Sequence, residues 1–235
     1  MQPLKLIFHL ETPYVSPGYP IHLDALVAYA MTQGSLDLLP KGADVRELRA
    51  LADRLPFGRH EQDGEWVWQA SALMPAGIVQ HWSHFYTQRR NERTYADLVG
   101  SGEIVQGRYR VGRELDPYGL TIDTARGVHR KMLGHYPLTS ADALVAWCIG
   151  DEEWLQEVMI DSGYLTHIGA RRRAGHGRVR AIEVQADEAA SDLWRMRVRP
   201  WPMLADDAPV QAAWKAPYWA VANRGRAFCP ASLLS

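Results

Sequence analysis

Cysteine is scarce in this sequence of 235 residues, and long apolar runs are absent. The two cysteines, Cys148 and Cys229, are too few for a disulfide framework and do not fit a metal-binding spacing. No apolar run approaches the roughly 20 residues that a membrane-spanning helix needs. The N-terminus also lacks the basic-then-apolar pattern of a signal peptide. We therefore expect a cytoplasmic protein without membrane contact, bound metal or cofactor.

Net charge is nearly absent as well, because 26 basic residues face 27 acidic ones. The overall balance therefore does not point to a nucleic-acid binder. The choice of cation does, since only four of the basic residues are lysine and the other 22 are arginine. Arginine binds phosphate through two parallel hydrogen bonds and stacks on bases, whereas lysine is a solvated point charge. A GC-rich genome would produce the same bias, so the positions of the arginines must decide.

The hydrophobic pattern predicts an α+β fold. Alternation over residues 4–10 predicts a strand, and one apolar face over residues 23–31 predicts a helix. The later predicted elements are a helix at 45–55, paired strands at 66–73 and 78–86, a strand at 143–149, a helix capped by Asp151, and strands at 178–185 and 194–199. The predicted buried face of the helix after Asp151 contains Trp154, Leu155, Val158 and Met159. This order predicts a ferredoxin-like (RRM-type) βαββαβ core in residues 1–200. We interpret the residues at about 88–130 as an extended inserted loop or hairpin, and residues 201–235 as a Trp/Pro-rich C-terminal extension.

The strongest local motif is a glycine-arginine loop before the strand at 178–185. Its glycines, Gly169, Gly175 and Gly177, let the backbone approach a ligand closely and adopt positive φ. Successive backbone N–H groups in such a loop can form an anion-binding nest. The loop differs from a P-loop, because no Gly-Lys-Ser/Thr follows it. A solvated turn with a chance run of arginines is the alternative. We predict that the loop binds RNA phosphates through Gly169, Arg171, Arg172, Arg173, Gly175, His176, Gly177 and Arg178.

A second arginine pattern lies at residues 194–199. In a strand, Arg195, Arg197 and Arg199 would face one way, with alternate side chains roughly 6.5–7 Å apart. That spacing is similar to the spacing of phosphates along an extended single strand. We predict RNA contacts for Arg195 and Arg197. The alternative is an exposed sheet face with solvated arginines.

The inserted segment is the third arginine-rich region. Cations alternate there with tyrosines, and single-stranded RNA binding needs cations together with stacking platforms. Acidic residues dilute the charge, so parts of the insertion could contact protein instead. The RNA-binding residues predicted here are Arg108, Arg110, Arg126, Arg130 and Lys131.

Catalysis is the rival hypothesis. A metal-independent endoribonuclease needs a general base near the 2′-OH and a cation on the scissile phosphate. His129, Lys131 and His135 could form such a set, as could His22 at the start of the first helix. None of them forms a recognisable motif, so we predict no catalytic residue. A scaffold that binds only proteins is a third hypothesis, based on the nine tryptophans.

Several segments together resemble a known family. The opening strand and helix contribute LIFHLETP and PIHLDALVAYA. The later matches are FYTQR (85–89), IDTARG (122–127), VAWCIGD (145–151) and the loop IGARRRAGHGRV (168–179). In this order they resemble the RAMP superfamily of CRISPR-associated proteins, most sharply the type IV effector subunit of the fifth Cas family.

The resemblance implies a role in a ribonucleoprotein. Such subunits bind the 5′ handle of the CRISPR RNA, cap the backbone filament of RAMP subunits and contact the large subunit. They also insert a thumb-like hairpin toward the first backbone subunit, and the resemblance implies that the insertion at about 88–130 is this thumb. A DinG-type helicase belongs to the wider system. Relatives in another CRISPR type cleave precursor RNA, but this chain has no clear equivalent of their catalytic trio. The residues that match the superfamily's Gly-rich loop are Gly169, Arg171, Arg172, Arg173, Gly175 and Gly177.

Overall fold

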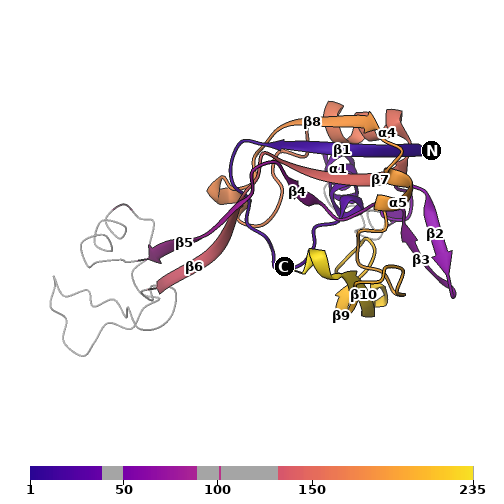
Figure 1. Cartoon of the computed structure of the whole chain (residues 1–235). Coiled ribbons are helices and arrows are strands. Elements are labelled where there is room, and N and C mark those ends of the chain that lie inside the picture. Colours follow the sequence, from indigo (N-terminus) through magenta and orange to yellow (C-terminus); the bar gives the residue numbers. More distant parts are fainter. Residues whose placement is uncertain (39–49, 89–100, 102–131, 235) are drawn as a thin grey trace. The chain divides into compact units, whose positions relative to one another are not determined.

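A computed structural model describes residues 1–38, 50–88, 101 and 132–234 of the chain (Figure 1). The described chain divides into two compact units, and the larger comprises Met1–Trp82 together with Leu138–Ser235. The smaller unit is Ser83–Pro137. The predicted helix at 45–55 is described only from residue 50, and almost all of the predicted thumb at 88–130 lies outside the described residues.

The larger unit is built on a four-stranded antiparallel sheet with the order β4-β7-β1-β8. Helix α1 lies between β1 and β4 in the chain, and α4 lies between β7 and β8. The predicted strands at 4–10, 143–149 and 178–185 and the predicted helix at 23–31 are confirmed. The bounds of the elements are β1 Gln2–Leu10, α1 Leu23–Leu38, β4 Met74–Ala76, β7 Ala143–Gly150, α4 Glu152–Gln156 and β8 Val179–Ala186.

The main hydrophobic core lies on one face of this sheet. Leu4, Leu6 and Phe8 alternate along β1 and are fully buried, and Leu23 and Val27 of α1 belong to the same core. A slip of one residue in β1 would turn these three side chains to the other face. The alternation that predicts the strand therefore also sets its register against β7 and β8.

Helix α4 of the larger unit begins after Asp151, as predicted. The Asp151 side chain accepts a hydrogen bond from the backbone N–H of Trp154 at 3.1 Å, which caps α4. The helix continues into a π-helical turn, Glu157–Asp161. Leu155 and Met159 are buried, but Trp154 is 37% exposed, so the prediction of a buried Trp154 is wrong. Residues 155 and 159 share one face of the helix, and Trp154 lies beside that face.

The predicted pairing of residues 66–73 with 78–86 is also wrong. Strand β3 (Glu65–Trp68) pairs with β2 (Arg59–Gln62) through a tight turn at Asp63 and Gly64, whose φ angles are 54° and 79°. Positive φ at both residues is typical of the two-residue turn that an Asp-Gly pair favours. Strand β5 (Gln80–Gln88) pairs instead with β6 (Met132–Ser140).

A second hydrophobic core involves the C-terminal part of the chain. Strands β9 (Asp207–Ala213) and β10 (Arg224–Pro230) pair antiparallel, and a short helix α5 (Ala190–Leu193) precedes them. Trp194, Trp201 and Trp214 are buried here against Val67 of β3. This core draws on residues from both sides of position 200. Whether residues 1–200 form a domain by themselves stays a prediction.

Candidate functional site: a glycine-arginine loop

The glycine-arginine loop lies between residues 168 and 178 and depends on its glycines. Gly169, Gly175 and Gly177 have φ angles of 91°, 82° and 71°, as the sequence predicts. A Cβ atom on Gly177 would lie 1.8 Å from the carbonyl oxygen of Ile168, and one on Gly169 would lie 2.6 Å from that of Val15. Any other residue at these two positions would collide with backbone atoms, so the glycines allow the close packing of the loop.

The loop is fastened to the segment that follows β1. The backbone N–H of Gly177 donates to the carbonyl of Pro13 at 2.8 Å, and the N–H of Ala170 donates to that of Val15 at 2.9 Å. The Thr12 hydroxyl donates to the carbonyl of Gly175 at 2.8 Å and accepts from the N–H of Arg178 at 2.9 Å. The Thr12 side chain therefore holds the C-terminal part of the loop at two points, Gly175 and Arg178.

The tip of the loop presents three exposed arginines, Arg171, Arg172 and Arg173. Arg172 and Arg173 begin a short 3-10 turn, and Arg171 has a φ of 58°, which is uncommon for a residue with a side chain. The guanidinium carbon of Arg172 lies 4.9 Å from the ring centre of Tyr29 on α1, a cation–π contact that orients it. The structure thus brings several cations to one anchored, solvent-facing turn.

Apart from Arg197, the remaining predicted site residues fall into three groups. His176 and Arg178 lie in the loop, where Arg178 forms an ion pair with Glu11 at 3.0 Å. Arg195 is paired with Asp192 at 2.6 Å and stays a predicted RNA contact. Five predicted residues lie outside the described part of the chain, namely Arg108, Arg110, Arg126, Arg130 and Lys131.

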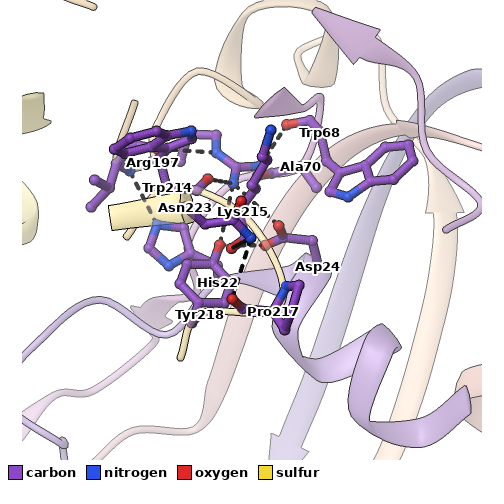
Figure 2. Close-up of polar contacts among 11 residues, drawn as sticks. His22, Asp24, Trp68, Ala70, Arg197, Trp214, Lys215, Pro217, Tyr218 and Asn223 are labelled. Atoms are coloured by element: carbon purple, nitrogen blue, oxygen red, sulfur yellow. Dashed lines mark hydrogen bonds and ion pairs between the residues drawn. The ribbon is translucent and has the colours of Figure 1, made fainter. Parts of the chain in front are cut away.

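Arg197 contradicts the prediction made for it. Residues 194–199 form turns and bends rather than a strand, and the Arg197 side chain is fully buried. Its guanidinium group donates to the carbonyls of Trp68, Ala70 and Trp214 at 2.5–2.7 Å (Figure 2). An ion pair with Asp24 at 3.3 Å balances its charge. A buried cation needs such partners, and Arg197 is therefore part of the core and not of an exposed face.

Arg199 is buried in the same way. Its side chain is 0% exposed and forms an ion pair with Asp207 at 2.5 Å. The same carboxylate also accepts the backbone N–H groups of Met203 and Leu204 at 2.7 and 2.8 Å. Two of the three arginines in residues 194–199, the WRMRVR segment, are therefore part of the protein interior.

His22, a candidate base of the ribonuclease hypothesis, belongs to this buried network. Its Nε2 atom accepts the backbone N–H of Val198 at 3.1 Å, and its ring stacks on Tyr218 with 5.0 Å between centres. Burial, followed by the nearby charge of Arg197, lowers the pKa of His22 to about 3. A neutral, enclosed imidazole cannot reach an RNA 2′-OH, which removes His22 as a candidate base. His129 and Lys131 lie outside the described residues.

Sequence reasoning missed Asp24 and Tyr218. The Tyr218 hydroxyl donates to Asp24 at 2.7 Å, and burial raises its pKa well above the usual value. The one available signal was an aspartate beside the apolar face of the first helix. This position indicates that the Asp24 carboxylate is unusual, but it does not identify Arg197 and Tyr218 as its partners.

The smaller unit contributes a second exposed surface. In its β5 and β6 segments, the rings of Tyr86 and Tyr136 lie 5.8 Å apart, and those of Phe85 and His135 lie 5.7 Å apart. Phe85 is 65% exposed. Neither strand contains Asp, Glu, Lys or Arg. The pair of strands β5 and β6 is therefore aromatic and has no Asp, Glu, Lys or Arg side chain, in contrast to the arginine-rich loop.

Neither a cluster of metal ligands nor a membrane-spanning helix is present in the described residues. Over these ranges, no three His, Cys, Asp or Glu side chains are grouped as metal ligands would be. Among the described helices, none has the length and apolar character to cross a membrane.

Comparison with protein-family models identifies the family of this chain. No curated protein matches the chain. The family model for Csf3, described as CRISPR type IV associated protein Csf3, matches residues 2–230. Because this match covers nearly the whole chain, the protein belongs to the Csf3 family of CRISPR type IV associated proteins.

Proposed function

We propose that this protein is a non-catalytic RNA-binding subunit of a type IV CRISPR effector ribonucleoprotein. It binds the 5′ handle of the CRISPR RNA and caps the filament of backbone RAMP subunits beside the large subunit. The observation that carries the proposal is the glycine-arginine loop, in which three exposed arginines stand on a backbone fastened to residues 12–15.

The sheet topology supports a ferredoxin-like core for this subunit. Taken in chain order, β1, α1, β4, β7, α4 and β8 form a βαββαβ unit. Their spatial order, β4-β7-β1-β8 with every neighbour antiparallel, is the order of the split βαβ arrangement. Strands β5 and β6 flank the segment at 88–130 and pair with each other, which supports a thumb-like insertion.

The chemistry of the loop suits phosphodiester oxygens. Guanidinium groups bind phosphate with two parallel N–H donors, and such charge-assisted hydrogen bonds are roughly twice as strong as neutral ones. Arg172 is held on Tyr29, which reduces the freedom it loses on binding. Gly169 and Gly177 let the loop pack closely against the backbone of Val15 and Ile168, which gives the arginines a fixed support.

Removing the three loop cations tests the proposal. We expect the triple change Arg171→Ala, Arg172→Ala and Arg173→Ala to abolish tight binding of a labelled 5′-handle RNA at physiological salt. The slope of log K against log salt should fall in magnitude by about 2, since each neutralised phosphate of a single strand contributes about 0.7. Filter binding over a salt series measures both quantities.

Two matched variants complete this experiment. The triple change to lysine keeps the charge but removes the paired N–H donors of the guanidinium groups. This variant should show the salt slope of the unchanged protein but only part of its affinity. Removal of the exposed Arg54, Arg224 and Arg226 takes away the same charge from other elements and should leave binding nearly intact. Equal affinity of the alanine variant and the unchanged protein would overturn the role of the loop. Cleavage of repeat RNA by the unchanged protein in EDTA would favour the endoribonuclease instead.

A further inference from the structure

The loop between β9 and β10 exposes two large apolar side chains. Trp219 is 57% exposed and Val221 is 86% exposed, whereas Trp201 and Trp214 nearby in the chain are only 5% and 6% exposed. The fold therefore buries the other tryptophans of this region and presents Trp219 to solvent. Adjacent exposed apolar side chains of this size are typical of an interaction site.

The backbone beneath these side chains is firmly anchored, as Figure 2 shows for Tyr218 and Asn223. Tyr218, directly before Trp219, donates to Asp24 at 2.7 Å and accepts from Arg197 at 3.2 Å. The side-chain amide of Asn223 donates to the carbonyl of Pro217 at 3.3 Å and closes the other end. An anchored loop loses little conformational entropy when a partner binds. Trp219 and Val221 are thus displayed on a preorganised support.

The chemistry of the surface is apolar at its tip and cationic at its border. The residues from 219 to 222 are Trp, Ala, Val and Ala, with no polar side chain among them. Arg224 and Arg226 follow on β10 and are exposed. Arg224 donates to the carbonyl of Tyr218 at 3.3 Å, which places this cation beside the base of the loop. A complementary surface would combine an apolar pocket with carboxylates at its rim.

We propose that the Trp219 loop, residues 217–223, docks into an apolar pocket bordered by Asp or Glu side chains on a partner protein. Tryptophan and arginine are the residues most enriched in the energetic centres of protein interfaces. Stacking of an RNA base on Trp219 would leave the aliphatic Val221 without a matching contact, so a protein partner fits better. Family membership indicates that the partner is another protein of the type IV system.

The test uses the full chain and each other protein component of its own system, measured in pairs by calorimetric titration without RNA. We expect one component to bind, and the double change Trp219→Ser with Val221→Ser to weaken that binding at least about 30-fold, the size of a hot-spot loss. The matched control is Tyr19→Ser with Ile78→Ser, because these side chains are 68% and 72% exposed. The control should bind as the unchanged protein does.

A second measurement guards against an indirect effect of the substitutions. Trp219 should be oxidised by hydroxyl radicals in the free protein and protected in the complex. Undiminished oxidation of Trp219 in the complex would overturn the proposal, as would wild-type binding by the double variant or the absence of binding to every component. Loss of RNA affinity with unchanged protein affinity would likewise overturn it and assign base stacking to Trp219. The titration between proteins contains no RNA. Its outcome is therefore independent of the proposed role of the glycine-arginine loop.

Discussion

Two arginine clusters in the described residues contain three arginines each, but one cluster is exposed and the other is largely buried. In the glycine-arginine loop, Arg171–Arg173 are exposed on a turn that glycines keep tight. In the WRMRVR segment, Arg197 and Arg199 are completely buried beside Asp24 and Asp207. The first cluster is accompanied by glycine and lacks large apolar side chains, whereas Trp194 and Val198 enter the core with the second. The residues that accompany the arginines therefore indicate the environment of such a motif: glycines favour an exposed turn, and large apolar side chains favour burial.

The comparison predicts that the buried cluster controls stability. We expect Arg197→Met to lower the free energy of unfolding by about 3–5 kcal/mol, because it leaves the Asp24 carboxylate buried without its cation. Urea unfolding followed by far-ultraviolet circular dichroism measures this change. Adding Asp24→Asn should recover part of the loss. The triple alanine variant of the loop serves as the contrast and should keep its unfolding midpoint.

The buried cluster should also make stability depend on pH. His22 has its pKa lowered to about 3 in the folded state, while in the unfolded chain it returns to the ordinary value of 6.5. Between these two values the unfolded state binds more protons, so this group's contribution to stability is full above pH 6.5 and declines as the pH falls toward 3. The maximum slope is about 1.4 kcal/mol per pH unit. Urea midpoints at several pH values should fall less steeply in His22→Gln, and parallel curves would contradict this assignment.

The smallest predicted effect lies in the exposed cluster. Tyr29→Leu removes the ring beneath Arg172 and should weaken binding of the handle RNA about 2- to 5-fold, the size of an exposed cation–π contact. Tyr29→Phe keeps the ring and should bind as the unchanged protein does. Fluorescence anisotropy with the same RNA is sensitive enough for this difference. Equal weakening in both variants would show that the hydroxyl, and not the ring, matters.

Local sequence was sufficient for the elements that depend on short-range physics. Alternation in β1 and the apolar faces of α1 predict these elements because burial on one face has a fixed period. The side chain of Asp151 caps α4 within three residues, and the glycines of the arginine loop adopt the positive φ that their lack of a Cβ permits. These interactions join residues close in the chain, so a reader of the sequence can anticipate them.

Tertiary structure alone decided which arginines are buried. Asp24 and Arg197 are separated by 173 positions, and no local pattern indicates that the helix near the N-terminus supplies the carboxylate. The pairing of β5 with β6 and the burial of Trp214 were likewise settled by contacts between segments that lie far apart in the chain. Burying a charge is stable only when its partner is already in place, and that partner is specified by the complete fold.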